Sequence, residues 1–95
     1  MKIIYALEAK NQLLAIKEYI AIDNKNRAIQ HLRQIKTKIE LLGKYPYLGK
    51  VNATIDNERV REFVVMGYKV IYKINEKSIT VLVIYKYIDF DETSL

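Results

Sequence analysis

The sequence predicts an α+β domain of two layers, in which an antiparallel helix pair packs on a mostly antiparallel four-stranded sheet. Three observations lead to this fold class. A short apolar run opens the chain, two stretches with helical periodicity follow, and three strand-like runs close it, in the order β-α-α-β-β-β. The chain has 95 residues, 51% of them hydrophobic, which is enough to build the core of one domain over residues 1–95.

The opening run, residues 2–7, contains β-branched side chains and predicts the first strand. From Glu8 onward the period changes, and about three helical turns follow. Their apolar positions recur at helical spacing, at Ala9, Leu13, Ile16 and Ile20. The polar sequence Asp23-Asn24-Lys25 ends this helix, and Asn24 is a candidate N-cap for the next one.

The second helix has the most regular pattern in the chain. Steps of four and three residues join its apolar positions into one stripe, formed by Ala28, Leu32, Ile35, Ile39 and Leu42. Gly43 directly follows this stripe, in the place where a C′ glycine commonly ends a helix. Because the break between the two helices is short, they should form an antiparallel hairpin.

An irregular segment, residues 44–58, follows the helices and holds the only proline of the chain. Its sequence Tyr45-Pro46-Tyr47-Leu48-Gly49 predicts a loop, and loops on rigid scaffolds often carry function. The alternative is a plain connector that Tyr45 and Leu48 pin against the core.

Three strands are predicted within residues 59–87, because most side chains there are β-branched or aromatic. Gly67 supplies a tight turn, since glycine adopts positive φ angles, and Asn75-Glu76-Lys77 supplies the second turn. The sheet face opposite the helices should carry the cations and tyrosines of these strands: Arg59, Arg61, Lys69, Lys73, Lys86, Tyr68, Tyr72, Tyr85 and Tyr87. Tyr68 and Tyr72 share one strand face and are alternatively core residues. Residues 89–95 form an acidic tail that is expected to fray.

The formal net charge of +5 favours an anionic partner such as nucleic acid, the ribosome or an acidic protein. The chain has no cysteine and one histidine, so no disulfide, metal or cofactor is expected. No apolar run reaches the ~20 residues of a membrane span, and the opening run meets Glu8 too early for a signal peptide. We therefore expect a soluble, cytoplasmic protein without a membrane partner.

Several motifs carry a resemblance that covers nearly the whole chain. They are Glu8-Ala9, Asn26-Arg27-Ala28, residues 42–49, Val60-Arg61-Glu62-Phe63 and Gly67-Tyr68-Lys69-Val70-Ile71-Tyr72. Together they resemble the RelE/ParE superfamily of toxins from bacterial type II toxin–antitoxin systems, and the proline-glycine loop before the Val-Arg-Glu strand is closer to the ParE branch. The resemblance implies a small basic toxin, neutralised by a cognate antitoxin and brought to DNA only indirectly, through the antitoxin complex. It also implies one of two targets. RelE-type members cut mRNA on the ribosome, and ParE-type members inhibit DNA gyrase.

By this resemblance, the candidate catalytic residues of a ribonuclease are Arg61, Lys69, Lys86 and Tyr72. Arg61 is the arginine of the Val-Arg-Glu motif, Lys69 replaces the usual arginine, and Lys86 stands where many members have a histidine. RNA cleavage needs positive charge on the phosphate and groups that transfer protons. Lysine and tyrosine have ordinary pKa values of ~10, far from neutral pH, so the missing histidine favours inhibition of gyrase by protein contact.

The candidate target-binding residues are Arg59, Arg61, Lys73, Arg27 and Arg33. The last two belong to a basic face of the second helix, which is alternatively an ordinary solvated face. His31 on this helix is interpreted as a surface residue, and Glu62 is expected to meet a cation on a neighbouring strand. A third functional hypothesis is an inactive relative that acts only as a binding module.

Overall fold

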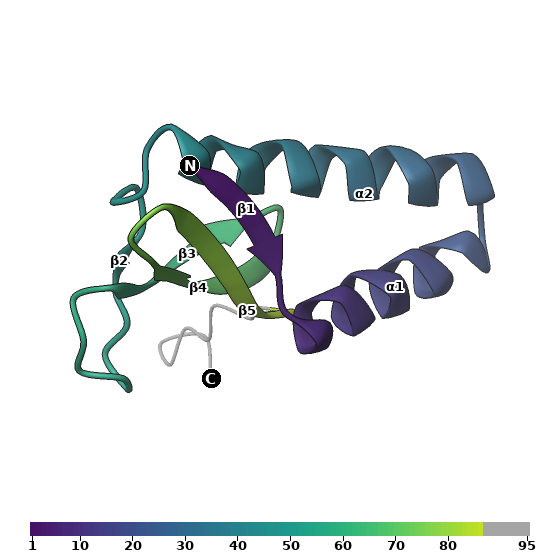
Figure 1. Ribbon diagram of the computed structural model, residues 1–95. Helices are drawn as coiled ribbons and strands as arrows, with labels where there is room; N and C mark the ends of the chain where they lie inside the picture. The colour runs from purple at the N-terminus through teal and green to yellow at the C-terminus, as the bar shows by residue number, and fades with distance from the viewer. Residues whose placement is uncertain (87–95) are drawn as a thin grey trace.

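The computed structural model describes residues 1–86, and they form a two-layer α+β fold (Figure 1). The elements are β1 (Lys2–Tyr5), α1 (Leu7–Ala21), α2 (Lys25–Glu40), the 3₁₀ helix η1 (Leu41–Gly43), β2 (Lys50–Val51), β3 (Val60–Val65), β4 (Tyr68–Ile74) and β5 (Ser78–Lys86). The predicted fold class is confirmed. Tyr87 and the acidic tail expected at residues 89–95 lie outside the described residues.

Within residues 1–86 the sheet has five strands in the order β1-β5-β4-β3-β2, one more than the sequence predicts. β1 runs parallel to β5, and every other neighbouring pair is antiparallel. The additional strand, β2, pairs Lys50 with Glu62 and Val51 with Arg61. Two residues are too few to show the alternating pattern of a strand, so periodicity could not reveal β2.

A β-bulge decides which side chains of β5 face the helices. Ile71 pairs with Val83, whereas its neighbour Tyr72 pairs with Val81, so β5 carries one extra residue, Leu82. The buried side chains of β5 are Ile79, Val81 and Ile84. They are two residues apart before the bulge and three residues apart across it.

Both helices cover the same face of the sheet, and the core lies between the two layers (Figure 1). The predicted helical stripes face this core. Their buried members are Ala9 and Leu13 of α1, Ala28, Ile35 and Ile39 of α2, and Leu42 of η1. The hairpin formed by α1 and α2 extends beyond the sheet, so Tyr19 and Ile22 near its tip are exposed.

The two ends of α2 differ in how well the sequence predicts them. Asn24 caps the start as predicted, because its side chain accepts a hydrogen bond from the Arg27 amide at 3.0 Å. The interpretation of Gly43 as a C′ residue is wrong, since α2 ends at Glu40 and Gly43 lies in η1 without a positive φ angle. Glycine is needed there for space, because a Cβ atom would lie 2.6 Å from the carbonyl oxygen of Met1.

Both predicted hairpin turns are confirmed. Between β3 and β4, Met66 and Gly67 have φ angles of 50° and 83°, as a two-residue type I′ turn requires. Between β4 and β5, the Asn75 side-chain amide donates to the hydroxyls of Ser78 and Thr80 at 3.0 and 2.8 Å. None of the helices in residues 1–86 is both long enough and apolar enough to cross a membrane.

Candidate functional site

The strand register divides the predicted site residues between two faces of the sheet, because directly paired residues point to the same face. Tyr72 is buried in the core and pairs with Arg61, while Tyr68 pairs with Lys86. These residues therefore lie on the helix-covered face. The opposite face carries Lys69, Lys73 and Tyr85. The expectation that one face holds all the strand cations and tyrosines is thus wrong, since side chains alternate along each strand.

Tyr72 connects the core to the segment that follows the helices. Its ring is fully buried and meets Phe63 edge-to-face at 5.9 Å between centroids. Its hydroxyl accepts a hydrogen bond from the Gly49 amide at 2.9 Å and donates one to the Pro46 carbonyl at 2.7 Å. Burial raises the pKa of Tyr72 above its ordinary value, against smaller opposing effects of the Gly49 amide and Arg61. This hydroxyl stays protonated at neutral pH and holds the backbone.

Arg61 binds the backbone of the same segment at two points. Its Nε atom donates to the Glu58 carbonyl at 3.0 Å, and its Nη1 atom donates to the Gly49 carbonyl at 2.9 Å. The guanidinium carbon lies 4.8 Å from the ring centroid of Tyr47, within the range of a cation–π interaction. The arginine of the Val-Arg-Glu motif thus acts first as a backbone clamp.

Residues 44–50, which we call the tyrosine loop, are therefore fixed by side chains that lie outside them. Tyr45 and Leu48 do not pin the loop, as the connector interpretation requires, because they are 51% and 54% exposed, and Tyr47 is 63% exposed. Gly49 is buried, and a Cβ atom there would lie 2.5 Å from the carbonyl oxygen of Glu62. The loop combines a held backbone with large exposed side chains.

Glu62 is a buried acid on the sheet face opposite the helices. Its carboxylate accepts a hydrogen bond from the Asn52 side-chain amide at 2.7 Å and lies 3.6 Å from the Lys69 ammonium. The exposed ammonium of Lys50 lies 3.8 Å away. The predicted pairing of Glu62 with a cation on a neighbouring strand is confirmed. Because Glu62 is only 7% exposed, this contact is screened less than an exposed ion pair.

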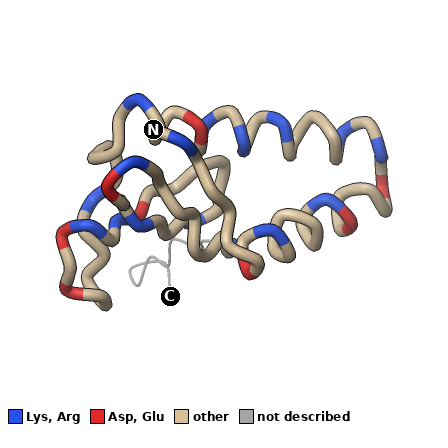
Figure 2. The backbone as a smooth tube through the Cα atoms, viewed as in Figure 1, with Lys and Arg blue, Asp and Glu red and all other residues tan. Residues whose placement is uncertain are grey.

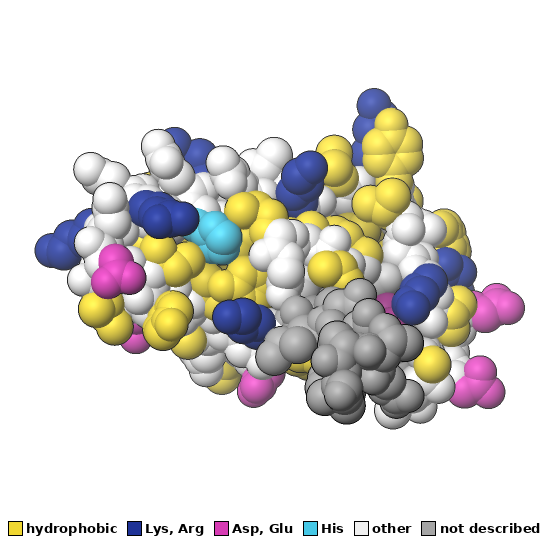
Figure 3. Space-filling model, turned by 180° about the vertical axis from the view of Figure 1, so that it is seen from behind, with side chains coloured by type: hydrophobic (Ala, Val, Ile, Leu, Met, Phe, Trp, Pro, Cys, Tyr) yellow, Lys and Arg dark blue, Asp and Glu magenta, His cyan; other side chains and the backbone are white. Residues whose placement is uncertain are grey.

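Lys86 lies at a groove on the helix-covered face. A hollow of about 390 Å³ separates α1 from the adjacent ends of β4 and β5, and Tyr19, Tyr68 and Lys86 contribute to its walls. His31 borders an adjoining hollow of about 250 Å³. It is half-buried at the surface of the protein, and its ring lies 5.9 Å from that of Tyr68 (Figure 3). Helix packing places this face of α2 against the start of β4, which helical periodicity alone does not show.

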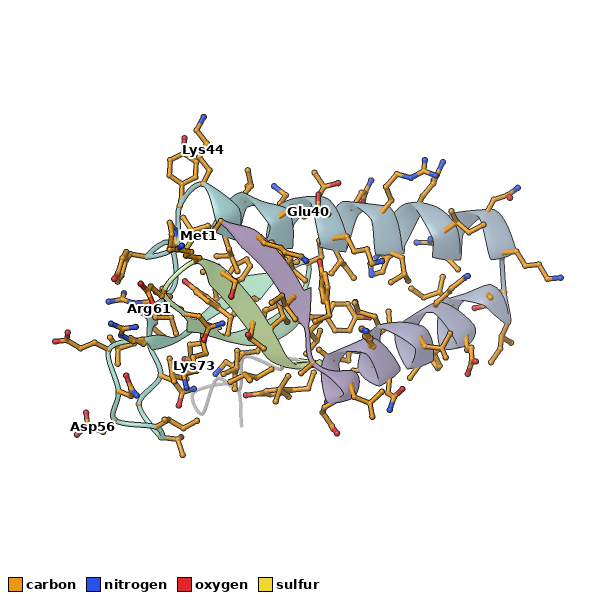
Figure 4. The ribbon with its side chains drawn as sticks, viewed as in Figure 1. Met1, Glu40, Lys44, Asp56, Arg61 and Lys73 are labelled. Carbon is orange, nitrogen blue, oxygen red and sulfur yellow. The ribbon has the colours of Figure 1, made fainter. Side chains whose placement is uncertain are left out.

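The remaining candidates do not lie together. Arg59 directly precedes β3. Figure 4 shows Arg61 and Lys73 at the end of the molecule that lies away from the tip of the helical hairpin. Arg27 lies in the first turn of α2, which begins at the tip of the helical hairpin (Figure 1). The cations of the helices, including the exposed Arg33, are spread along them without forming one patch (Figure 2).

A second groove, between α1 and α2, was not predicted. It encloses about 420 Å³ and has apolar walls formed by Leu13, Leu14, Ile29 and Leu32. Lys10, Lys17 and Lys36 also border it, and none of the described residues that line it is acidic. One feature of the sequence points to this groove: Leu14 and Ile29 are apolar residues that lie beside the core stripes of the two helices.

Tyr5 also lines this inter-helix groove. Among the described residues its buried hydroxyl has no hydrogen-bond partner, and the Lys36 ammonium lies 5.8 Å from its ring centroid. Burial, and to a smaller extent the negative charge of Glu40, raises the pKa of Tyr5 to about 12.

The four candidate catalytic residues do not converge. Tyr72 and Lys86 share a face but stand four positions apart along β4, roughly 13 Å at the usual strand rise. Lys69 lies on the other face beside Glu62. Residues 1–86 also contain no group of three or more His, Cys, Asp or Glu side chains arranged to hold a metal ion.

The fold and these surfaces define a small basic domain with two helices on one face of a mixed sheet. The family model described as "ParE toxin of type II toxin-antitoxin system, parDE" matches residues 3–86, so the chain belongs to this family of toxins. The resemblance to the ParE branch is confirmed, and membership implies a cognate antitoxin partner.

Comparison with solved structures gives the same fold. A chain from the chromosomal ParDE toxin–antitoxin system of P. aeruginosa superposes with a TM-score of 0.76 at 18% sequence identity. The match covers 93% of this chain and 97% of that chain. A comparison with curated protein sequences found no match.

Proposed function

We propose that this toxin stops bacterial growth by binding DNA gyrase and that it catalyses no reaction of its own. The dispersal of Arg61, Lys69, Lys86 and Tyr72 carries this proposal. Cleavage of RNA requires a base, an acid and positive charge around one phosphate group. Here two of the four residues hold a loop and the other two lie on opposite faces of the sheet. Inhibition by protein contact needs no such convergence.

The proposed target-binding residues form two groups. The sheet-end group consists of Arg59 and Arg61 around the start of β3 and Lys73 near the end of β4, and the second group consists of Arg27 and Arg33 on α2. Arg27 lies near the hairpin tip and Arg33 lies midway along α2, so these two cations do not form one compact patch with Arg59, Arg61 and Lys73. The sheet-end group adjoins the tyrosine loop, whose exposed side chains supply apolar contact area next to the charges.

The inter-helix groove supports the proposed mode of neutralisation. Its apolar walls and three lysines fit an acidic amphipathic segment of the antitoxin, which orders when it binds. We expect the toxin to act in the cytoplasm and to reach DNA only through the antitoxin complex. An adjacent reading frame that encodes an acidic protein of similar or smaller size would support this arrangement.

Purified toxin tests the target directly. It should inhibit DNA supercoiling by purified gyrase, and added antitoxin should restore the activity. Unchanged supercoiling at a large molar excess of toxin would remove gyrase as the target. A parallel incubation with ribosomes and mRNA covers the alternative, since cleavage there would identify a RelE-like ribonuclease.

Induction of the toxin in cells provides an independent readout. Pulse labelling in the first minutes should show DNA synthesis failing before protein synthesis, together with a DNA-damage response. An earlier collapse of protein synthesis would instead favour mRNA cleavage. Harmless expression at high level would favour the inactive binding module.

A further inference from the structure

The tyrosine loop exposes three large side chains without using them in the core. Tyr45, Tyr47 and Leu48 are each more than half exposed, although they follow one another around a single proline. Isolated apolar side chains on a surface are common, whereas a group of this kind on one short loop marks an interaction site. In Figure 3, hydrophobic and cationic side chains project together at one end of the molecule.

Hydrogen bonds from the sheet hold the backbone of the loop without any partner present. The buried Tyr72 hydroxyl bonds to both Pro46 and Gly49, and Arg61 bonds to Gly49 from another direction. At position 49 only glycine fits, because a Cβ atom would approach both Glu62 and Tyr72 within 3 Å. A loop that is already ordered loses little conformational entropy on binding, so more of the contact energy appears as affinity.

The charges beside the exposed rings indicate the chemistry of the partner. The Lys44 ammonium lies 5.5 Å from the Tyr45 ring centroid, and Arg61 lies over Tyr47. Figure 4 shows Lys44 pointing away from the body of the protein. Residues 44–50 contain two lysines and no acid, and the side chain of Lys50 is 81% exposed. Tyrosines beside cations are typical anchors of protein interfaces.

We propose that the tyrosine loop is the element with which this toxin grips its target protein. In this arrangement Tyr45, Tyr47 and Leu48 enter apolar pockets of the target, and carboxylates around those pockets meet Lys44 and Lys50. The inference rests on the proposed function, because it names the contact surface of a toxin that acts by protein binding. It makes the loop, and not the helical hairpin, the principal contact.

The first test compares two double variants with matched exposure. Tyr45→Ser with Tyr47→Ser removes the loop anchors, and Tyr19→Ser with Ile22→Ser removes two side chains near the hairpin tip that are at least as exposed. For the loop variant, the toxin concentration that half-inhibits gyrase supercoiling should rise about 30-fold or more, as for the loss of interface anchors. The hairpin variant should stay within about twofold of the unmodified toxin. Equal losses in both variants would overturn the proposal.

Folding and antitoxin binding are measured on the same samples. Circular dichroism should give both variants the melting temperature of the unmodified toxin, since the replaced side chains lie outside the core. If the loop variant does unfold, Lys44→Glu replaces it, and its weakened inhibition should depend on salt because it opposes carboxylates on the target. Titration with the purified antitoxin should show unchanged affinity for the loop variant. A loop variant that loses antitoxin binding and keeps full inhibition would overturn the proposal.

Growth after induction in cells tests the role of the loop independently of whether gyrase is the target. If the unmodified toxin leaves gyrase unaffected, the proposed target is wrong, and growth on induction still tests the loop. A harmless loop variant beside a fully toxic hairpin variant, at equal expression, would support the proposal whatever the target protein. Full toxicity of the loop variant would overturn it.

Discussion

The hydroxyl of Tyr72 donates a hydrogen bond to the carbonyl oxygen of Pro46 over 2.7 Å, although 26 residues separate them in the chain. The same hydroxyl accepts a hydrogen bond from the Gly49 amide. One core side chain thus fixes both sides of a turn whose own side chains face solvent. The relationship explains why a surface loop without regular secondary structure holds one shape, and it leads to the first two predictions.

Tyr72→Phe should destabilise the protein by about 1–3 kcal/mol, because the buried Gly49 amide and Pro46 carbonyl lose their common partner while the ring still fills the core. Urea unfolding measures this loss. Tyr85→Phe, at an exposed position of the same sheet, is the control and should change stability by less than about 0.5 kcal/mol. Equal stability of the Tyr72 variant and the unmodified toxin would show that the loop is held by other contacts.

Gly49→Ala should cost about 1–3 kcal/mol, as expected for overpacking, because the new methyl group meets the Glu62 carbonyl oxygen and the Tyr72 hydroxyl. Its effect is best compared with Gly67→Asn. At Gly67 a Cβ atom meets nothing within 4 Å, and asparagine tolerates the positive φ angle. Thermal melts should therefore show a clear loss for the Gly49 variant and a small one for the Gly67 variant. The reverse order would contradict the geometry of the loop.

Glu62→Ala should destabilise the protein by about 1–3 kcal/mol, because the Asn52 amide loses its acceptor and two lysines lose a nearby carboxylate. The loss is measured by urea unfolding in low salt and in high salt. Glu76→Ala, in the exposed turn between β4 and β5, serves as the control and should be nearly neutral. If both glutamates behave alike, Glu62 contributes no more than a surface charge.

The stability of the protein should fall as the pH rises from about 10 to about 12, in part because of Tyr5. The pKa of Tyr5 is raised from 10.0 to about 12, so the folded state keeps its proton after the unfolded chain has released it. The favourable contribution is therefore complete below pH 10 and is lost as the pH rises toward 12. The raised pKa of Tyr72 acts in the same direction.

A comparison of the unmodified toxin with Tyr5→Phe isolates this contribution from the titration of the lysines. Urea midpoints measured between pH 9 and pH 12 should fall less steeply for the variant. At pH 7 the variant should be at least as stable as the unmodified toxin, since the buried Tyr5 hydroxyl has no partner among the described residues. Parallel curves for the two proteins would contradict the assignment.

The candidate site shows where prediction from the sequence stops. Arg61 and Tyr72 are candidate site residues because of their place in two motifs, but the motifs do not reveal that both bind the backbone of the tyrosine loop. The inter-helix groove was missed because its walls combine residues of two helices, and no periodicity within one helix encodes the angle between them. Lys69 and Lys86 lie on different faces of the sheet, and this can be read only from the register of β4 against β5.

The sequence by itself determined the order of the helices and of the four longer strands, the cap at Asn24, the turn at Gly67 and the apolar stripes of both helices. These features depend on local backbone preferences and on side chains spaced within one element. The tertiary structure alone decided the strand β2, the bulge in β5, the space requirement of Gly43 and the outward display of the tyrosine loop. Each of these arises from contacts between residues far apart in the chain, and their partners meet only when the two layers pack.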